Sequence, residues 1–195
     1  ISSLDQASDG RAGYNAVTSV IDQFALNYSL TGHLDREARY ERADEFLQVL
    51  RKILTEENVE FAGDHYRIRD YTASPRPAVV PELFQGGTST AARRNGGLYS
   101  DWYFTNGNTP DKLKEQIEDI RAKARDNGHS VKIGVNAFVI ARDTEEEARA
   151  VLQEIIDNAD PDAVKAFGHE VKNAGKASPE GEGNWAKSSF EDLVQ

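Results

Sequence analysis

The sequence predicts an α/β fold with a mainly parallel sheet and helices packed outside it. Short apolar segments alternate four times with amphipathic helical segments along the 195 residues, and parallel sheets need such helical connections between their strands. An open doubly wound sheet and a (β/α)8 barrel both satisfy this pattern. A complete barrel typically has about 250 residues and eight strands, so four strands would form about half of one.

The first part of the chain predicts a helix end, a strand and a long amphipathic helix. The opening residues, ISSLDQASDGR, predict the end of a helix followed by a turn, and the apolar residues 12–20 then predict a buried strand. A polar loop of about twenty residues follows, a length that usually indicates function. The helix is expected over residues 36–57, because apolar side chains recur there at helical spacing: Ala38, Ala43, Phe46, Leu47, Leu50, Ile53 and Leu54.

Turn and cap residues divide the rest of the chain. Two short strands around Gly63-Asp64 predict a hairpin at about 58–70, outside the main sheet. Thr109 and Pro110 predict a helix start, and Thr144 with Glu147 forms a capping box for the next helix. The main strands are expected at 82–87, 101–107 and 131–141, the last covered on both faces, with a short helix at 88–97 and a mainly polar loop from 169 onward.

The composition disfavours several classes of partner. The net charge is −10, which argues against non-specific binding to nucleic acid and to anionic membranes. The chain has no cysteine, so disulfides and thiolate metal sites are excluded, and no apolar stretch reaches the ~20 residues of a membrane span. We therefore expect a cytoplasmic protein. The absence of methionine at position 1 leads us to expect a chain that starts inside a longer one.

Two features of the sequence are candidates for ligand binding. Gly87, Thr88 and Ser89 follow an apolar strand and precede a helix, where unpaired N–H groups can receive a phosphate; a tight turn with a hydroxyl N-cap is the alternative. Asn15 lies in an apolar strand, where its amide could bond either a neighbouring loop or a ligand.

The four histidines offer no metal site. His33, His65, His129 and His169 are not at metal-ligand spacing with one another or with a carboxylate, so each is interpreted as a surface residue and no metal is expected. Only His33 lies in a loop that leaves the carboxyl end of a strand, where barrel sites are built. It is the one candidate for a catalytic residue.

Five segments of the chain carry a family resemblance: 4–19, 38–55, 82–93, 100–124 and 133–148. Their order and spacing resemble the bacterial luciferase-like flavin monooxygenases, in particular their dimethyl sulfone and alkanesulfonate branches. The resemblance implies a (β/α)8 TIM barrel of the luciferase-like type, of which this chain, residues 1–195 as one partial barrel domain, covers strands four to seven. It also implies reduced FMN as cofactor, O2 as co-substrate and a separate NAD(P)H-dependent flavin reductase.

The same resemblance implies the cofactor-binding residues. Gly87, Thr88 and Ser89 would bind the FMN phosphate, Tyr40 would reach that phosphate from its helix, and Asn15 would face the flavin. Arg36 stands where related enzymes carry a histidine.

Two residues of the strand predicted at 131–141 indicate the charge of the substrate. Alkanesulfonate enzymes carry an arginine and a histidine where this chain has Asn136 and Phe138. A sulfonate anion in a dry pocket requires a cation, whereas a neutral sulfone does not. The sequence therefore favours a neutral organosulfur substrate.

Together these features lead us to expect a reduced-FMN-dependent monooxygenase that cleaves dimethyl sulfone to methanesulfinate and formaldehyde, homo-oligomeric when full length. Oxygenation of alkanesulfonates or other substrates of this family is the enzymatic alternative. A half-barrel that only binds a phosphate-bearing ligand is the non-enzymatic alternative, since we expect the 195-residue chain alone to be inactive.

Overall fold

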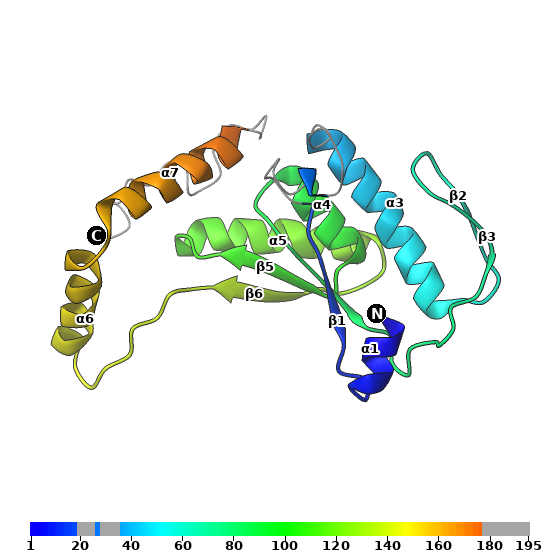
Figure 1. Cartoon of the computed structure of the whole chain (residues 1–195), viewed down its shortest axis with the longest axis horizontal. Helices are drawn as coiled ribbons and strands as arrows, with labels where there is room; N and C mark the ends of the chain where they lie inside the picture. Colours follow the sequence, from blue (N-terminus) through cyan, green and yellow to red (C-terminus); the bar gives the residue numbers. More distant parts are fainter. Residues whose placement is uncertain (19–25, 28–35, 177–195) are drawn as a thin grey trace. The chain divides into compact units, whose positions relative to one another are not determined.

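The computed structural model describes residues 1–18, 26–27 and 36–176 (Figure 1). The chain divides into two compact units, Ile1–Val135 and Asn136–Gln195. The first unit contains almost all of the sheet and its covering helices. Most of the described residues of the second unit, 136–176, lie in two helices.

The main sheet has four strands in the order β1-β4-β5-β6. β1 pairs with β4, and β4 with β5, in parallel, and the arrows of β5 and β6 run in the same direction in Figure 1. The predicted four-stranded parallel sheet is therefore confirmed. The strands are β1 (Gly13–Ala16), β4 (Glu82–Gly86), β5 (Trp102–Asn106) and β6 (Lys132–Asn136).

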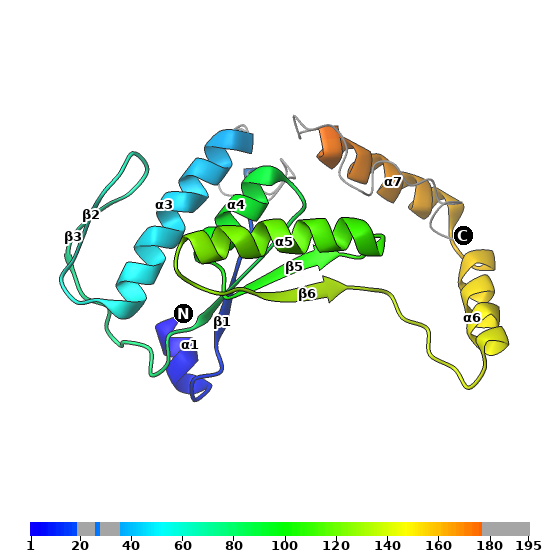
Figure 2. The same ribbon diagram turned by 180° about the vertical axis from the view of Figure 1, so that it is seen from behind.

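Three helices cover one face of this sheet. α3 packs against α4, and α4 against α5 (Figure 2). Leu83 and Tyr103 point from the strands into this helical layer and are almost completely buried, whereas their strand neighbours Phe84 and Phe104 lie on the opposite face, as strand alternation requires. The helices are α3 (Arg36–Thr55), α4 (Thr90–Tyr99) and α5 (Pro110–Asp126).

Tyr103 is the largest side chain of the core. Its ring packs with Ile120, Ala124 and Val131, and it lies against α4 at Gly96, where any Cβ would overlap the ring. A glycine inside a helix costs about 0.5–1 kcal/mol relative to alanine. Here the missing side chain makes room for the aromatic ring.

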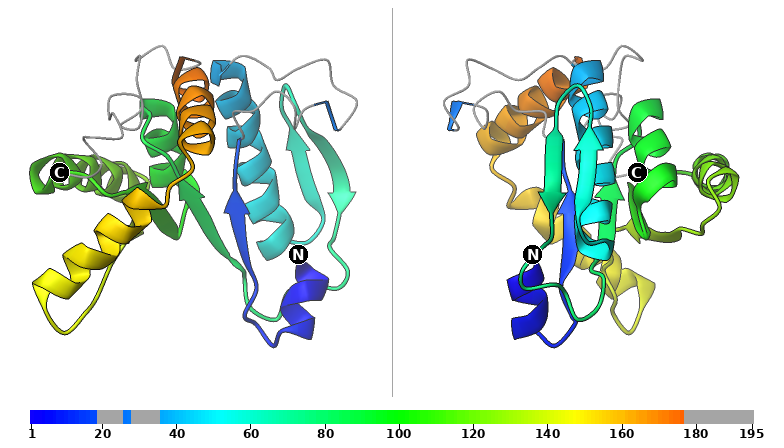
Figure 3. Two further views of the ribbon diagram at one scale, coloured as in Figure 1. Left: turned by 60° about the vertical axis from the view of Figure 1, so that its left-hand side comes forward. Right: turned by 90° about the vertical axis from the view of Figure 1, so that its right-hand side faces the viewer.

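The predicted hairpin consists of β2 (Val59–Ala62) and β3 (Arg67–Tyr71), which pair in antiparallel fashion. It stands beside α3 and outside the main sheet (Figure 3). The Glu45 carboxylate of α3 accepts hydrogen bonds from the backbone N–H groups of Asp64, His65 and Tyr66 at 2.8, 2.8 and 3.1 Å. Partial desolvation raises the pKa of Glu45, but the three hydrogen bonds together lower it more. The pKa of Glu45 therefore lies below its ordinary value.

Helices begin and end where the cap and turn residues of the sequence predict. α1 (Ser2–Ala7) precedes the turn at Asp9 and Gly10. Pro110 opens α5 as expected, although the Thr109 side chain makes no capping bond. α6 (Glu145–Asp157) begins at Thr144, whose hydroxyl accepts from the Glu147 N–H at 3.2 Å.

Three predictions about the strands and the last helix are wrong in detail. β1 ends at Ala16 and exposes Gly13 and Asn15, and β6 ends at Asn136 and is not covered on both faces. The described helices of the first unit pack on only one face of the sheet, so side chains on the other face stay exposed at these two edge strands. Residues 169–176, expected to be loop, extend α7 (Pro161–Lys176), because Glu170, Lys172 and Ala174 are residue types that favour a helix.

Candidate flavin site

A cleft of about 510 Å³ opens at the carboxyl ends of β1 and β4. In parallel α/β proteins this is the end of the sheet at which ligands bind. Asn15, Tyr40 and Gly87 line the cleft together with Phe84 and Phe104. Three of the predicted cofactor-binding residues, from three separate segments, are thus brought to one place.

The turn after β4 adopts a backbone shape that requires glycine. Gly87 has φ +140°, a conformation that side-chain-bearing residues rarely adopt. A Cβ at Gly87 would also lie 2.8 Å from the Ala92 Cβ and 4.0 Å from the Tyr40 hydroxyl. The turn therefore approaches α3 and α4 closely, with bare backbone at the edge of the cleft.

Ser89 begins the helix that follows this turn. It is the N-cap of α4, and its hydroxyl oxygen accepts from the Ala92 N–H at 3.2 Å. The Ser89 hydroxyl hydrogen remains able to donate to a ligand, because an accepting hydroxyl keeps its own donor. Thr88 and Ser89 are half-buried and adjoin the cleft-lining Gly87, although they do not line the cleft themselves.

Asn15 and Tyr40 supply further polar groups to the cleft. Asn15 is exposed on β1, so its amide needs no structural partner and is accessible to a ligand. Tyr40 is half-buried in the first part of α3, and its backbone carbonyl accepts from the buried Asn95 amide at 3.2 Å. This bond links the helix that carries Tyr40 to the helix that begins at the turn.

Aromatic rings form the open face of the sheet below the cleft. Phe84, Trp102 and Phe104 stack with centroids 6.1–6.3 Å apart. Phe104 remains 44% exposed, so part of this ring surface is available for contact. Flat apolar surface of this kind suits a planar heteroaromatic ligand and excludes water from it.

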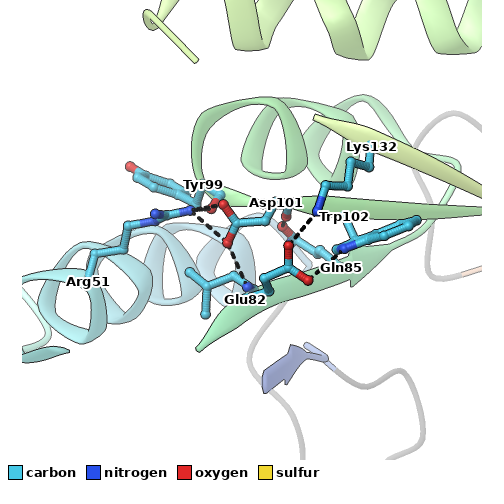
Figure 4. Close-up of polar contacts among 9 residues, drawn as sticks. Arg51, Glu82, Gln85, Tyr99, Asp101, Trp102 and Lys132 are labelled. Carbon is cyan, nitrogen blue, oxygen red and sulfur yellow. Dashed lines mark hydrogen bonds and ion pairs between the residues drawn. The ribbon is translucent and has the colours of Figure 1, made fainter. Parts of the chain in front are cut away.

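A polar network holds the amino ends of β4, β5 and β6 (Figure 4). Asp101 accepts from the Leu83 N–H at 2.8 Å and pairs with the Arg51 guanidinium of α3 at 3.1 Å. Beside it, Glu82 accepts from Lys132 Nζ at 2.5 Å and from the Trp102 indole N–H at 2.9 Å. These two donors hold the pKa of Glu82 below its ordinary value.

Asn136 and Phe138 are not among the residues that line the cleft. His33 lies outside the described residues, so its role stays a prediction. Asn136 ends β6, and Phe138 follows it with 80% of its surface exposed; both belong to the second unit, Asn136–Gln195.

Sequence reasoning missed two residues that contact the turn. Tyr103 and Gln116 both donate to the Gly87 carbonyl, at 3.0 and 3.2 Å. Tyr103 resembles an ordinary core residue in its apolar strand, and Gln116 lies in a polar stretch of α5. Only the burial of Gln116, which is 7% exposed, distinguishes it from the solvated residues around it.

Within residues 1–18, 26–27 and 36–176, no group of three or more histidine, aspartate or glutamate side chains is placed to bind a metal ion. In the same part of the chain, every helix is too short or too polar to cross a membrane.

Comparison with known proteins identifies the family. The luciferase-like monooxygenase family model matches residues 1–192, so the chain belongs to this family, and its fold is the α/β barrel type predicted from the resemblance. It is 57% identical, over its whole length, to an FMNH(2)-dependent dimethylsulfone monooxygenase of Pseudomonas putida, and 55% identical to that of Pseudomonas fluorescens (strain Pf0-1).

The chain spans about half the length of these curated relatives, 54% and 53%. Among solved structures, DmoA from Hyphomicrobium sulfonivorans superposes with a TM-score of 0.73 at 26% identity, covering 85% of this chain and 41% of that one.

The Glu82 network predicts an acid transition that tryptophan fluorescence can follow. A carboxylate whose pKa is lowered in the folded state stabilises the fold above its unfolded pKa, and this stabilisation is lost as pH falls through the folded pKa. Protonation of Glu82 would weaken its bond to the Trp102 indole N–H. With Trp185 replaced by Phe, we therefore expect Trp102 emission to change with a midpoint below pH 4.5, the ordinary pKa of this side chain.

The control is Glu82→Gln, which should remove this transition while far-UV circular dichroism stays constant in both proteins. A midpoint at or above 4.5, or an unaltered transition in Glu82→Gln, would contradict the assignment.

Proposed function

We propose that the chain contributes the FMN-phosphate side of a reduced-FMN-dependent monooxygenase that acts on dimethyl sulfone. The observation that carries this proposal is 57% identity over the whole chain to a relative named for that activity. Per turnover, dimethyl sulfone, O2 and reduced FMN would yield methanesulfinate, formaldehyde, oxidised FMN and water. The whole 195-residue chain would form one partial barrel domain in this enzyme.

The residues at the cleft fit reduced FMN in charge and shape. A phosphate needs several N–H or O–H donors, and the Thr88 and Ser89 backbone and hydroxyl groups with the Tyr40 hydroxyl would supply them. Gly87 lets this turn lie close against α4, since a Cβ there would meet the Ala92 Cβ at 2.8 Å.

The remaining cleft residues would act on the ring system. Asn15 carries both a donor and an acceptor that can orient a flavin edge, and the Phe84 and Phe104 rings would exclude water from the reacting face. Reduced FMN supplies the electrons and, with O2, the oxygen-transferring chemistry. The catalytic side chains stay unassigned, with His33 as a candidate from the sequence.

Partners follow from the form of the cofactor. The relatives are named for FMNH(2), the reduced flavin, so we propose that a separate NAD(P)H-dependent reductase supplies it. We also propose a homo-oligomeric protein in the cytoplasm, where NAD(P)H is available, with a small organosulfur molecule as substrate and neither nucleic acid nor membrane as partner.

Thr88→Ala and Tyr40→Phe should each weaken the binding of reduced FMN by about 1.5–3 kcal/mol, because each removes a hydrogen bond to a charged phosphate. Anaerobic titration of the full-length gene product measures this loss. The exposed Thr55→Ala and Tyr71→Phe serve as matched controls and should bind normally. Unchanged affinity in both test variants would mean that the turn is only a tight turn.

The full-length gene product should convert dimethyl sulfone in strong preference to methanesulfonate. By strand alternation, the Asn136 side chain lies on the same face of β6 as Gly134 and Lys132. Asn136 and Phe138 are both uncharged, so neither can neutralise a bound sulfonate. Burying an unpaired sulfonate costs several kcal/mol. Asn136→Arg should therefore narrow the preference, and the neutral control Asn136→Gln should not.

Sulfinate release from both substrates, under the same supply of reduced flavin, measures this preference. Comparable kcat/KM values for the two substrates in the unmodified protein would refute the neutral-substrate proposal. Absence of sulfinate from either substrate would refute the organosulfur reaction itself.

A further inference from the structure

The Gly87 carbonyl is held by two side chains from two other elements. The Tyr103 hydroxyl of β5 donates to it at 3.0 Å, and the Gln116 amide of α5 donates at 3.2 Å. A carbonyl oxygen has two lone pairs, so these donors can satisfy both. Tyr103 is 0% and Gln116 7% exposed, so water does not compete strongly for either bond.

Fixing this carbonyl also fixes the next N–H group. The peptide bond between Gly87 and Thr88 is planar and trans, so its C=O and N–H point in opposite directions. With the carbonyl directed toward Tyr103 and Gln116, the Thr88 N–H is directed away from the core. Without these two hydrogen bonds the plane of the Gly87–Thr88 peptide could turn over, because glycine has few steric restrictions.

The two donors are themselves held by packing. The Tyr103 ring packs in the core with Ile120 and Ala124 and lies against Gly96 of α4. Gln116 lies one helical turn before Ile120 on the same side of α5. Burial, and secondarily the nearby Tyr40 hydroxyl, raise the pKa of Tyr103 above its ordinary value, so the hydroxyl stays protonated and able to donate at neutral pH.

We propose that Tyr103 and Gln116 are positioning residues for the FMN phosphate: they orient the Gly87–Thr88 peptide so that the Thr88 N–H faces the phosphate. This inference rests on the proposed function, because it assumes that the phosphate binds at this turn. Neither side chain touches the phosphate in this arrangement. Their effect passes entirely through the backbone.

The test compares reduced FMN with reduced riboflavin, which has the same ring system without the phosphate. We expect Tyr103→Phe and Gln116→Leu each to weaken FMN binding about threefold to tenfold, as for loss of one hydrogen bond. The affinity for riboflavin should stay unchanged. Anaerobic titrations of the full-length gene product with each flavin supply both numbers.

Matched controls separate positioning from general loss of structure. Tyr99→Phe removes a tyrosine hydroxyl that donates to Asp44 at 2.8 Å, and Gln48→Leu removes an amide that donates to the same carboxylate at 2.8 Å. Both controls should leave the ratio of FMN to riboflavin affinity as in the unmodified protein, even if they lower the unfolding temperature as much as the test variants do.

The possible results have distinct meanings. A phosphate preference that persists in both Tyr103→Phe and Gln116→Leu, or an equal loss of affinity for both flavins, overturns the positioning role alone. Equal binding of FMN and riboflavin by the unmodified protein overturns the phosphate site, and the positioning role with it. A selective loss of FMN affinity supports both.

Discussion

The Asp101 carboxylate is the constraint on which the rest of the sheet depends. It accepts from the Leu83 N–H at 2.8 Å and pairs with Arg51 of α3, while its backbone carbonyl accepts from the Lys132 N–H at 2.9 Å. One residue thereby joins β4, β5, β6 and the covering helix. Because side chains alternate along a strand, a one-residue slip here would exchange the two faces of β5.

The strand register that Asp101 sets at the amino ends of the strands also determines the geometry at their carboxyl ends. Phe84 lies opposite Trp102, and Gln85 opposite Tyr103, so the aromatic rings gather on the open face and the Tyr103 hydroxyl reaches Gly87 through the helical layer. In the proposed site, the contacts to the phosphate and to the flavin ring would therefore rest on backbone and side chains that the same strand pairing fixes. Tyr103, a core residue, would direct the binding turn without touching the ligand.

Local chemistry explains which parts of this structure the sequence could predict. Thr144 with Glu147 and the proline at 110 fix helix starts through neighbouring residues, and these elements were predicted correctly. The ends of β1 and β6 depend on whether a further strand lies alongside, which no local pattern records. Gly87 was singled out by its place between a strand and a helix, and Tyr40 by family resemblance. Tyr103 and Gln116 were missed because their contacts with the turn depend on where β5 and α5 meet it.

A crystal structure of the full-length gene product with FMN would show whether the turn after β4 binds the flavin phosphate. We expect phosphate oxygens about 2.7–3.2 Å from the Thr88 backbone nitrogen and the Ser89 hydroxyl, with the Gly87 carbonyl still bonded to Tyr103 and Gln116. A phosphate bound elsewhere, with this turn facing only solvent, would contradict this expectation.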